Sequence, residues 1–88
     1  MHAIVFRITI HDQKESDRLL REDFVPGMTQ AAGFVTGYWV TSGENKGTSV
    51  IVFESEEDVQ RVLQMADPPQ TEAFTLDSLE TGEVVAHA

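Results

Sequence analysis

The spacing of hydrophobic residues changes along the chain between a period of two, typical of strands, and the period of a helix. The order of these changes limits the possible folds more than any other feature. Residues 3–10 alternate between the two sides of an extended segment, and one side is wholly apolar. That side carries Ile4, Phe6, Ile8 and Ile10. A period of two predicts a β-strand. From about residue 13 the apolar residues recur at helical spacing instead, so a helix is expected to follow.

The first predicted helix contains a proline. Asp12 followed by Glu15 resembles a capping box, which satisfies free N–H groups where a helix begins. An apolar stripe stays in phase on both sides of Pro26, through Leu20, Phe24, Met28 and Ala31. Because proline removes one backbone hydrogen bond and clashes with the preceding turn, we expect a helix that is kinked or interrupted near residue 26. Gly33 is expected to cap its carboxyl end.

A hairpin is predicted after this helix. Residues 34–41 are rich in aromatic and β-branched side chains, which is typical of a second strand. Polar turn-forming residues fill positions 41–47 and predict a hairpin loop. Residues 49–54 are predicted to form a third strand, and its segment 50–53 is apolar on both faces.

A second helix and a last strand complete the pattern. Ser55 is expected to cap the helix, whose buried face is formed by Val59, Val62, Leu63 and Ala66. Pro68 and Pro69 are expected to end it, and residues 67–75 to form a loop. The last strand is predicted within residues 79–88, most clearly over 83–87.

This order, β-α-β-β-α-β, predicts an α+β fold in which one domain covers residues 1–88. Each crossover between parallel strands is right-handed, and two interleaved crossovers give a split β-α-β arrangement. The expected result is the ferredoxin-like fold. It has a four-stranded antiparallel sheet in the order 4-1-3-2, with both helices on one face.

The central strands carry apolar residues on both faces, as shown by Val5 next to Phe6 and by residues 50–53. A sheet covered on one face only should alternate apolar and polar residues. We therefore expect a second copy of the chain to cover the open face, giving a homodimer with a two-fold axis. The contact is expected to bring Val5 together with some of Val35, Ile51 or Val85. Which residues of the second and third strands point inward is left open.

The charge balance and the absence of cysteine exclude several functions. The chain has 6 Lys+Arg against 15 Asp+Glu, a net charge of −9, which argues against nucleic acid and anionic membrane surfaces. Without cysteine there are no disulfides, zinc fingers or thiol nucleophiles. The longest apolar run is too short to cross a bilayer, and Arg7 interrupts the N-terminal run. We therefore expect a cytoplasmic protein.

Three stretches resemble small proteins of the dimeric α+β barrel superfamily, in its branch similar to antibiotic-biosynthesis monooxygenases. They are the Pro26 helix leading into residues 33–39, the strand running into an acidic helix start at 52–57, and the closing residues 83–88. The resemblance implies two sheets packed face to face as a barrel, and a cavity between sheet and helices. It also implies one of several activities: cofactor-free oxidation of aromatic compounds, haem degradation, lactone isomerisation or none.

The haem-degrading relatives rely on Asn, Trp and His. Here the only asparagine is Asn45, in the predicted hairpin loop, and the second helix has no Trp or His, so haem degradation is disfavoured. We expect no cofactor. Two functions remain open: a cofactor-independent monooxygenase-like protein that acts on or binds an aromatic compound, or a non-catalytic ligand-binding or structural homodimer. An enzyme needs a cavity of roughly 300 Å³ or more with convergent polar groups.

The candidate pocket lies between the sheet and the interrupted helix, where Gly37 leaves space beside Trp39. Its candidate residues are Phe24, Met28, Tyr38, Trp39 and Arg7. Each has an alternative: the apolar side chains are also suited to core or dimer packing, and Arg7 to pairing with a carboxylate. No residue is assigned a catalytic role.

Two histidines lie near the ends of the chain. If Ile4 were opposite Val85 in neighbouring strands, His2 would face His87. Facing histidines can bind a metal or titrate together, but no third ligand is evident, so no metal site is expected.

Overall fold

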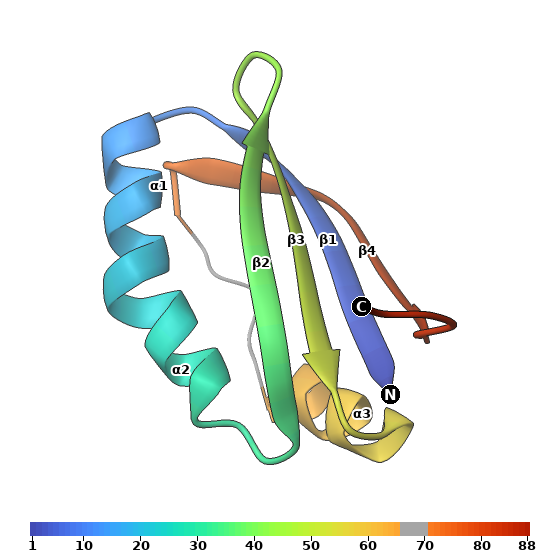
Figure 1. Cartoon of the computed structure of the whole chain (residues 1–88). Coiled ribbons are helices and arrows are strands. Elements are labelled where there is room, and N and C mark those ends of the chain that lie inside the picture. Colours follow the sequence, from blue (N-terminus) through green and yellow to red (C-terminus); the bar gives the residue numbers. More distant parts are fainter. Residues whose placement is uncertain (66–70) are drawn as a thin grey trace.

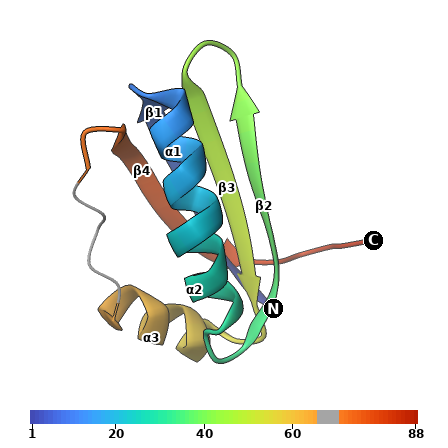
Figure 2. The same ribbon diagram turned by 90° about the vertical axis from the view of Figure 1, so that its left-hand side faces the viewer.

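The computed structural model describes residues 1–65 and 71–88. Its elements are β1 (His2–Ile10), α1 (Gln13–Leu19), η1 (Leu20–Phe24), α2 (Val25–Thr29), β2 (Phe34–Ser42), β3 (Lys46–Phe53), α3 (Glu56–Met65) and β4 (Phe74–Glu83). The strands form one antiparallel sheet in the order β2-β3-β1-β4, and the helices lie on one of its faces (Figures 1 and 2). The predicted ferredoxin-like fold and strand order are confirmed.

The helix interruption predicted near Pro26 takes the form of a π-helical turn. Helical backbone runs without a break through α1, η1 and α2, and the Val25 N–H donates to the Leu20 carbonyl, five residues back. Proline has no N–H, and its ring crowds the carbonyl four residues earlier. A wider turn directly before Pro26 relieves this crowding, and such turns insert one extra residue into a helix. Phe24 and Met28 both still pack against the core.

The hydrophobic core lies at one end of the sheet because of the residues that β3 turns toward the helices. These are Gly47, Ser49, Ile51 and Phe53, all buried, and their size increases along the strand. Ile51 and Phe53 join Ile4 and Val59 in the core, and the Phe53 ring meets Phe34 edge-on at 6.2 Å between centroids. At the other end Ile8 packs over Gly47, where a Cβ would lie 2.9 Å from its Cγ1.

The predicted helix starts are confirmed. The Asp12 carboxylate accepts from the Glu15 N–H at 3.1 Å, and the Ser55 hydroxyl accepts from the Asp58 N–H at 3.3 Å. Gly33 has a positive φ of 82°, but α2 already ends at Thr29, so Gly33 is not the helix cap that was expected. It allows a close approach instead, because a Cβ there would lie 2.1 Å from Asp58 Oδ2.

The last strand was predicted within residues 79–88 and most clearly over 83–87, but only residues 79–83 of that range belong to it. β4 begins at Phe74 and ends at Glu83, and residues 84–88 are not part of a strand. The pairing with β1 explains this, because Glu83 is paired with His2, which is the first residue of β1. Ile4 therefore faces Thr81 rather than Val85, and His87 does not face His2. The predicted end of the second helix, Ala66 with Pro68 and Pro69, lies outside the described residues, as do residues 67–70 of the predicted loop. The loop prediction is wrong for residues 74–75, which already belong to β4.

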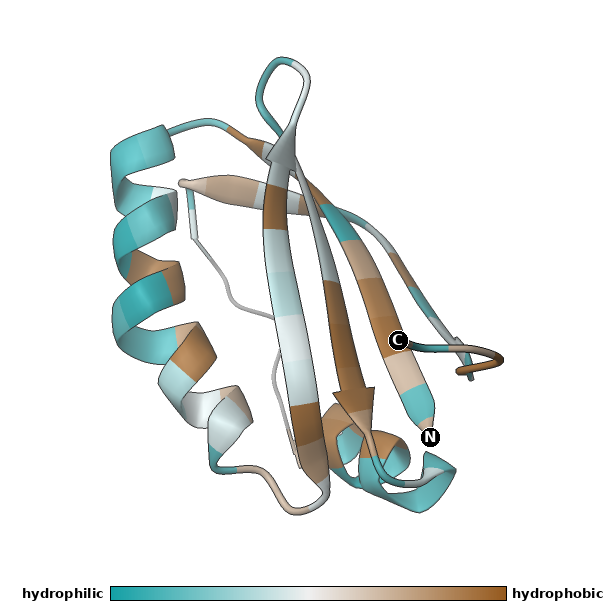
Figure 3. Cartoon of the chain, viewed as in Figure 1, coloured by the Kyte–Doolittle hydropathy of each residue, from teal (hydrophilic) through white to brown (hydrophobic). Residues whose placement is uncertain are grey.

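The sheet face away from the helices carries the alternate residues. Val5 pairs with Val50, and Tyr38 on the next strand also pairs with Val50. Ile51, expected as a possible dimer contact, is fully buried on the helix side, and Val85 lies beyond β4. The apolar residues of the open face are thus Val5, Val50, Val52, Tyr38 and Val40. Figure 3 shows that hydrophobic residues of β1 and β3 gather in the half of the sheet near the N-terminus.

Candidate ligand cavity

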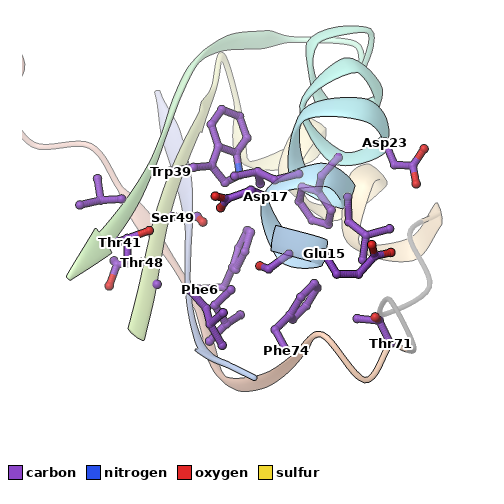
Figure 4. Close-up of a pocket in the computed structure, with 18 residues that line it drawn as sticks. Phe6, Glu15, Asp17, Asp23, Trp39, Thr41, Thr48, Ser49, Thr71 and Phe74 are labelled. Atoms are coloured by element: carbon purple, nitrogen blue, oxygen red, sulfur yellow. The ribbon is translucent and has the colours of Figure 1, made fainter. Parts of the chain in front are cut away.

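A cavity of about 360 Å³ lies between the sheet and the helical segment formed by α1 and η1. Its wall is largely apolar, and four aromatic rings contribute to it (Figure 4). These rings belong to Phe6, Phe24, Trp39 and Phe74. Phe6 on β1 and Phe24 on η1 touch across the gap, with ring centroids 5.6 Å apart, and so join the sheet to the helix beside the cavity.

The cavity exists because small residues face the helix at this end of the sheet. Gly47 and Ser49 of β3 line it, and Ser16 of α1 faces them from the helix side. Both serines are buried, at 5 and 7% exposure. Larger side chains at these positions would fill the space, as Ile51 and Phe53 do further along β3. The two hydroxyls place hydrogen-bonding groups in an otherwise apolar wall.

Trp39 forms the part of the wall contributed by β2. Its six-membered ring lies over Gly37, because a Cβ at that position would come within 2.7 Å of Trp39 Cη2. The space that Gly37 was expected to leave open is therefore occupied by the Trp39 ring. Among the described residues, the Trp39 Nε1 is the buried side-chain nitrogen or oxygen without a hydrogen-bond partner. An unsatisfied buried donor costs about 1–3 kcal/mol.

The five residues predicted for the pocket lie in three different places. Phe24 and Trp39 line the cavity. Met28 lies with Phe24 beside a second hollow of about 570 Å³, between α2 and α3. Tyr38 and Arg7 lie on the opposite, open face of the sheet, where Tyr38 is 65% exposed and Arg7 is opposite Thr48. They face away from the cavity because residues one position apart on a strand point to opposite faces.

Several residues that line the cavity were not predicted to do so, among them Phe6, Phe74, Ser16 and Ser49. Gly47 and Ser49 precede Ile51 and Phe53 in the same row of β3, but the sequence does not show that this row faces the helices. The signal for Phe74 was absent, because the strand that carries it was predicted too late in the chain.

The charged side chains that line the cavity are acidic: Glu15, Asp17 and Asp23. Arg18 pairs with both Glu15 and Glu22, and its hydrogen bond holds the pKa of the Glu15 carboxyl below its usual value. Asp17 accepts a hydrogen bond from the neutral Gln13 amide at 2.9 Å. Within residues 1–65 and 71–88, no group of three histidine or acidic side chains is arranged to hold a metal ion, and no helix is long and apolar enough to cross a membrane.

Replacing Gly37 with alanine should displace the Trp39 ring, because the new methyl group would overlap it. We expect a changed Trp39 emission spectrum and a lower melting temperature. Gly82→Ala is the matched control, since a Cβ on that β4 glycine meets nothing within 4 Å. Identical spectra for the two variants would contradict the described position of the indole.

Comparison with known proteins gives a match of fold. No family model matches the chain, and no curated protein matches its sequence. Among solved structures it is similar to the haem degrader MhuD from Mycobacterium tuberculosis, determined with two haems bound in its active site. The match has 21% identity and a TM-score of 0.59, and it covers 97% of this chain and 98% of the other. The chain therefore shares the fold of MhuD over nearly its whole length.

Proposed function

We propose that this chain is a small-molecule protein whose cavity binds a flat aromatic compound. The observation that carries the proposal is the aromatic-lined cavity of about 360 Å³ between sheet and helix. Ligand sites are typically apolar hollows of about 300–1,000 Å³ with a few polar groups. The haems in the active site of MhuD, which has the same fold, support the flat aromatic shape of the ligand and not its charge, since haem itself carries two carboxylates.

The residues of the wall have separate roles in this proposal. The rings of Phe6, Phe24 and Phe74 contact the apolar faces of the ligand, and burial contributes about 25 cal/mol per Å². The hydroxyls of Ser16 and Ser49 fix its orientation through hydrogen bonds. The unpartnered N–H of Trp39 is a donor available to an oxygen of the ligand.

The catalytic form of this function is a cofactor-independent monooxygenation. In such a reaction a CH₂ group of an electron-rich aromatic compound becomes a carbonyl. One atom of O₂ enters the product and the other leaves as water, with the substrate supplying all four electrons. The step begins with removal of a proton from the substrate, and for this role we propose Asp17, one of the three carboxylates of the wall. The alternative is a homodimer that binds the compound without oxidising it.

Binding should be lost when the cavity is filled. Titration of the protein with anthrone is expected to shift the Trp39 emission. Ser16→Leu, which inserts a larger side chain into the wall, should abolish the shift while the melting temperature stays close to that of the parent chain. Lys14→Leu adds a leucine to an exposed position of the same helix and serves as control. No response of the parent chain to anthrone, naphthoquinone or haem would contradict the proposed function.

Oxygen uptake with anthrone separates the catalytic form of the proposed function from the non-catalytic one.

We also propose that a second copy of the chain covers the open face of the sheet. Val40 and Tyr38 are 53 and 65% exposed there and adjoin Val5, Val50 and Val52. Soluble monomers rarely expose a contiguous apolar surface of this kind. A two-fold axis lets the same surface complement itself.

Val5→Lys should convert the dimer to a monomer. The new lysine lies beside Glu80 on β4, so the charge is tolerated in a single subunit, whereas burial under a second sheet is costly. Light scattering at micromolar concentration is expected to give 9.8 kDa for the variant and twice that mass for the parent chain. Gln60→Lys, on an exposed position of α3, should leave the dimer intact. A parent chain of 9.8 kDa would contradict the proposed assembly.

A further inference from the structure

The charged groups around the cavity all have one sign. Three carboxylates line it, and no lysine, arginine or histidine does so among the described residues. The nearest arginine along α1, Arg18, is held by Glu15 and Glu22. An anionic ligand would therefore meet repulsion without a compensating cation.

The three carboxylates do not contribute equally. Arg18 balances the charge of Glu15. Asp23 is exposed, and in Figure 4 it points away from the aromatic rings. Asp17 is half-buried, and in the same view it projects from α1 toward the strand that carries Trp39. Asp17 accepts a hydrogen bond from Gln13, whose amide is neutral, so this bond does not balance the negative charge of Asp17.

We propose that the cavity selects aromatic compounds that carry a protonated amine and excludes aromatic anions, with Asp17 as the residue that determines this preference. The inference rests on the proposed function and names the class of ligand. A carboxylate at a partly buried site attracts an ammonium group more strongly than one in water, because the effective dielectric constant is lower. The net charge of −9 draws cations toward the protein and acts in the same direction. The aromatic wall is compatible with a cation as well, since the faces of such rings attract positive charge.

Three compounds with the same naphthalene ring test the inference. They are 1-naphthylmethylamine, 1-naphthylmethanol and 1-naphthoic acid, which are cationic, neutral and anionic at pH 7. Calorimetric titration at low ionic strength should rank the amine first and the acid last. We expect the amine and the acid to differ by at least about tenfold in affinity, which corresponds to about 1.4 kcal/mol.

Two variants show whether Asp17 is responsible. Asp17→Asn keeps the shape of the side chain and should weaken amine binding about fivefold while leaving the alcohol unchanged. Glu57→Gln removes the same single negative charge at an exposed position of α3 and should leave the ranking unchanged. A parallel loss of amine binding in both variants would overturn the role of Asp17.

The outcomes distinguish this inference from the proposed function. If the acid binds as well as the amine, charge selection is wrong and the aromatic cavity stands. If the alcohol, the amine and the acid all fail to bind, both the charge selection and the proposed function are wrong. A preference for the amine that persists unchanged in Asp17→Asn would assign the selection to another group.

Discussion

The gradient of side-chain size along the helix-facing row of β3 is the constraint on which the rest of the structure depends. Phe53 and Ile51 fill the space beneath the helices at one end, and with Ile4 and Val59 they form the core. Ser49 and Gly47 occupy the other end, where they line the cavity. One strand therefore determines where both the core and the cavity lie. The close packing at one end offsets the stability that is lost where the other end is left unfilled.

The proline of the first helix has a related consequence. The π-helical turn over residues 20–24 accommodates Pro26 without ending the helix, so the same helical segment reaches from the cavity to the core. Phe24 lies in this turn and lines both hollows of the structure, on the one side next to Phe6 and on the other next to Met28. A π turn places its side chains differently from an α-helix, and such turns often occur at functional sites.

The sequence was sufficient to predict the element order, the strand order and the two helix starts, because hydrophobic periods and N-terminal capping residues act locally. It was insufficient for the position of β4, since that strand has weak alternation and its register depends on where β1 begins. Alternation also shows that a strand has two faces without showing which one meets the helices. Tyr38 and Arg7 were for this reason grouped with Trp39, although they lie on the other face. Ser16 and Ser49 were missed because a buried serine is recognisable only when its neighbours in space are known.

The location of a bound aromatic compound tests this account most directly. Magnetisation transfer in NMR spectra between the ring protons of 1-naphthylmethanol and the methyl groups of the protein would give it. The account predicts contacts with the methyl groups of Ile8 and Leu20, and with the indole of Trp39, all of which line the cavity. Contacts with the methyl groups of Val50 and Val52 alone would place the compound on the open face of the sheet and contradict it.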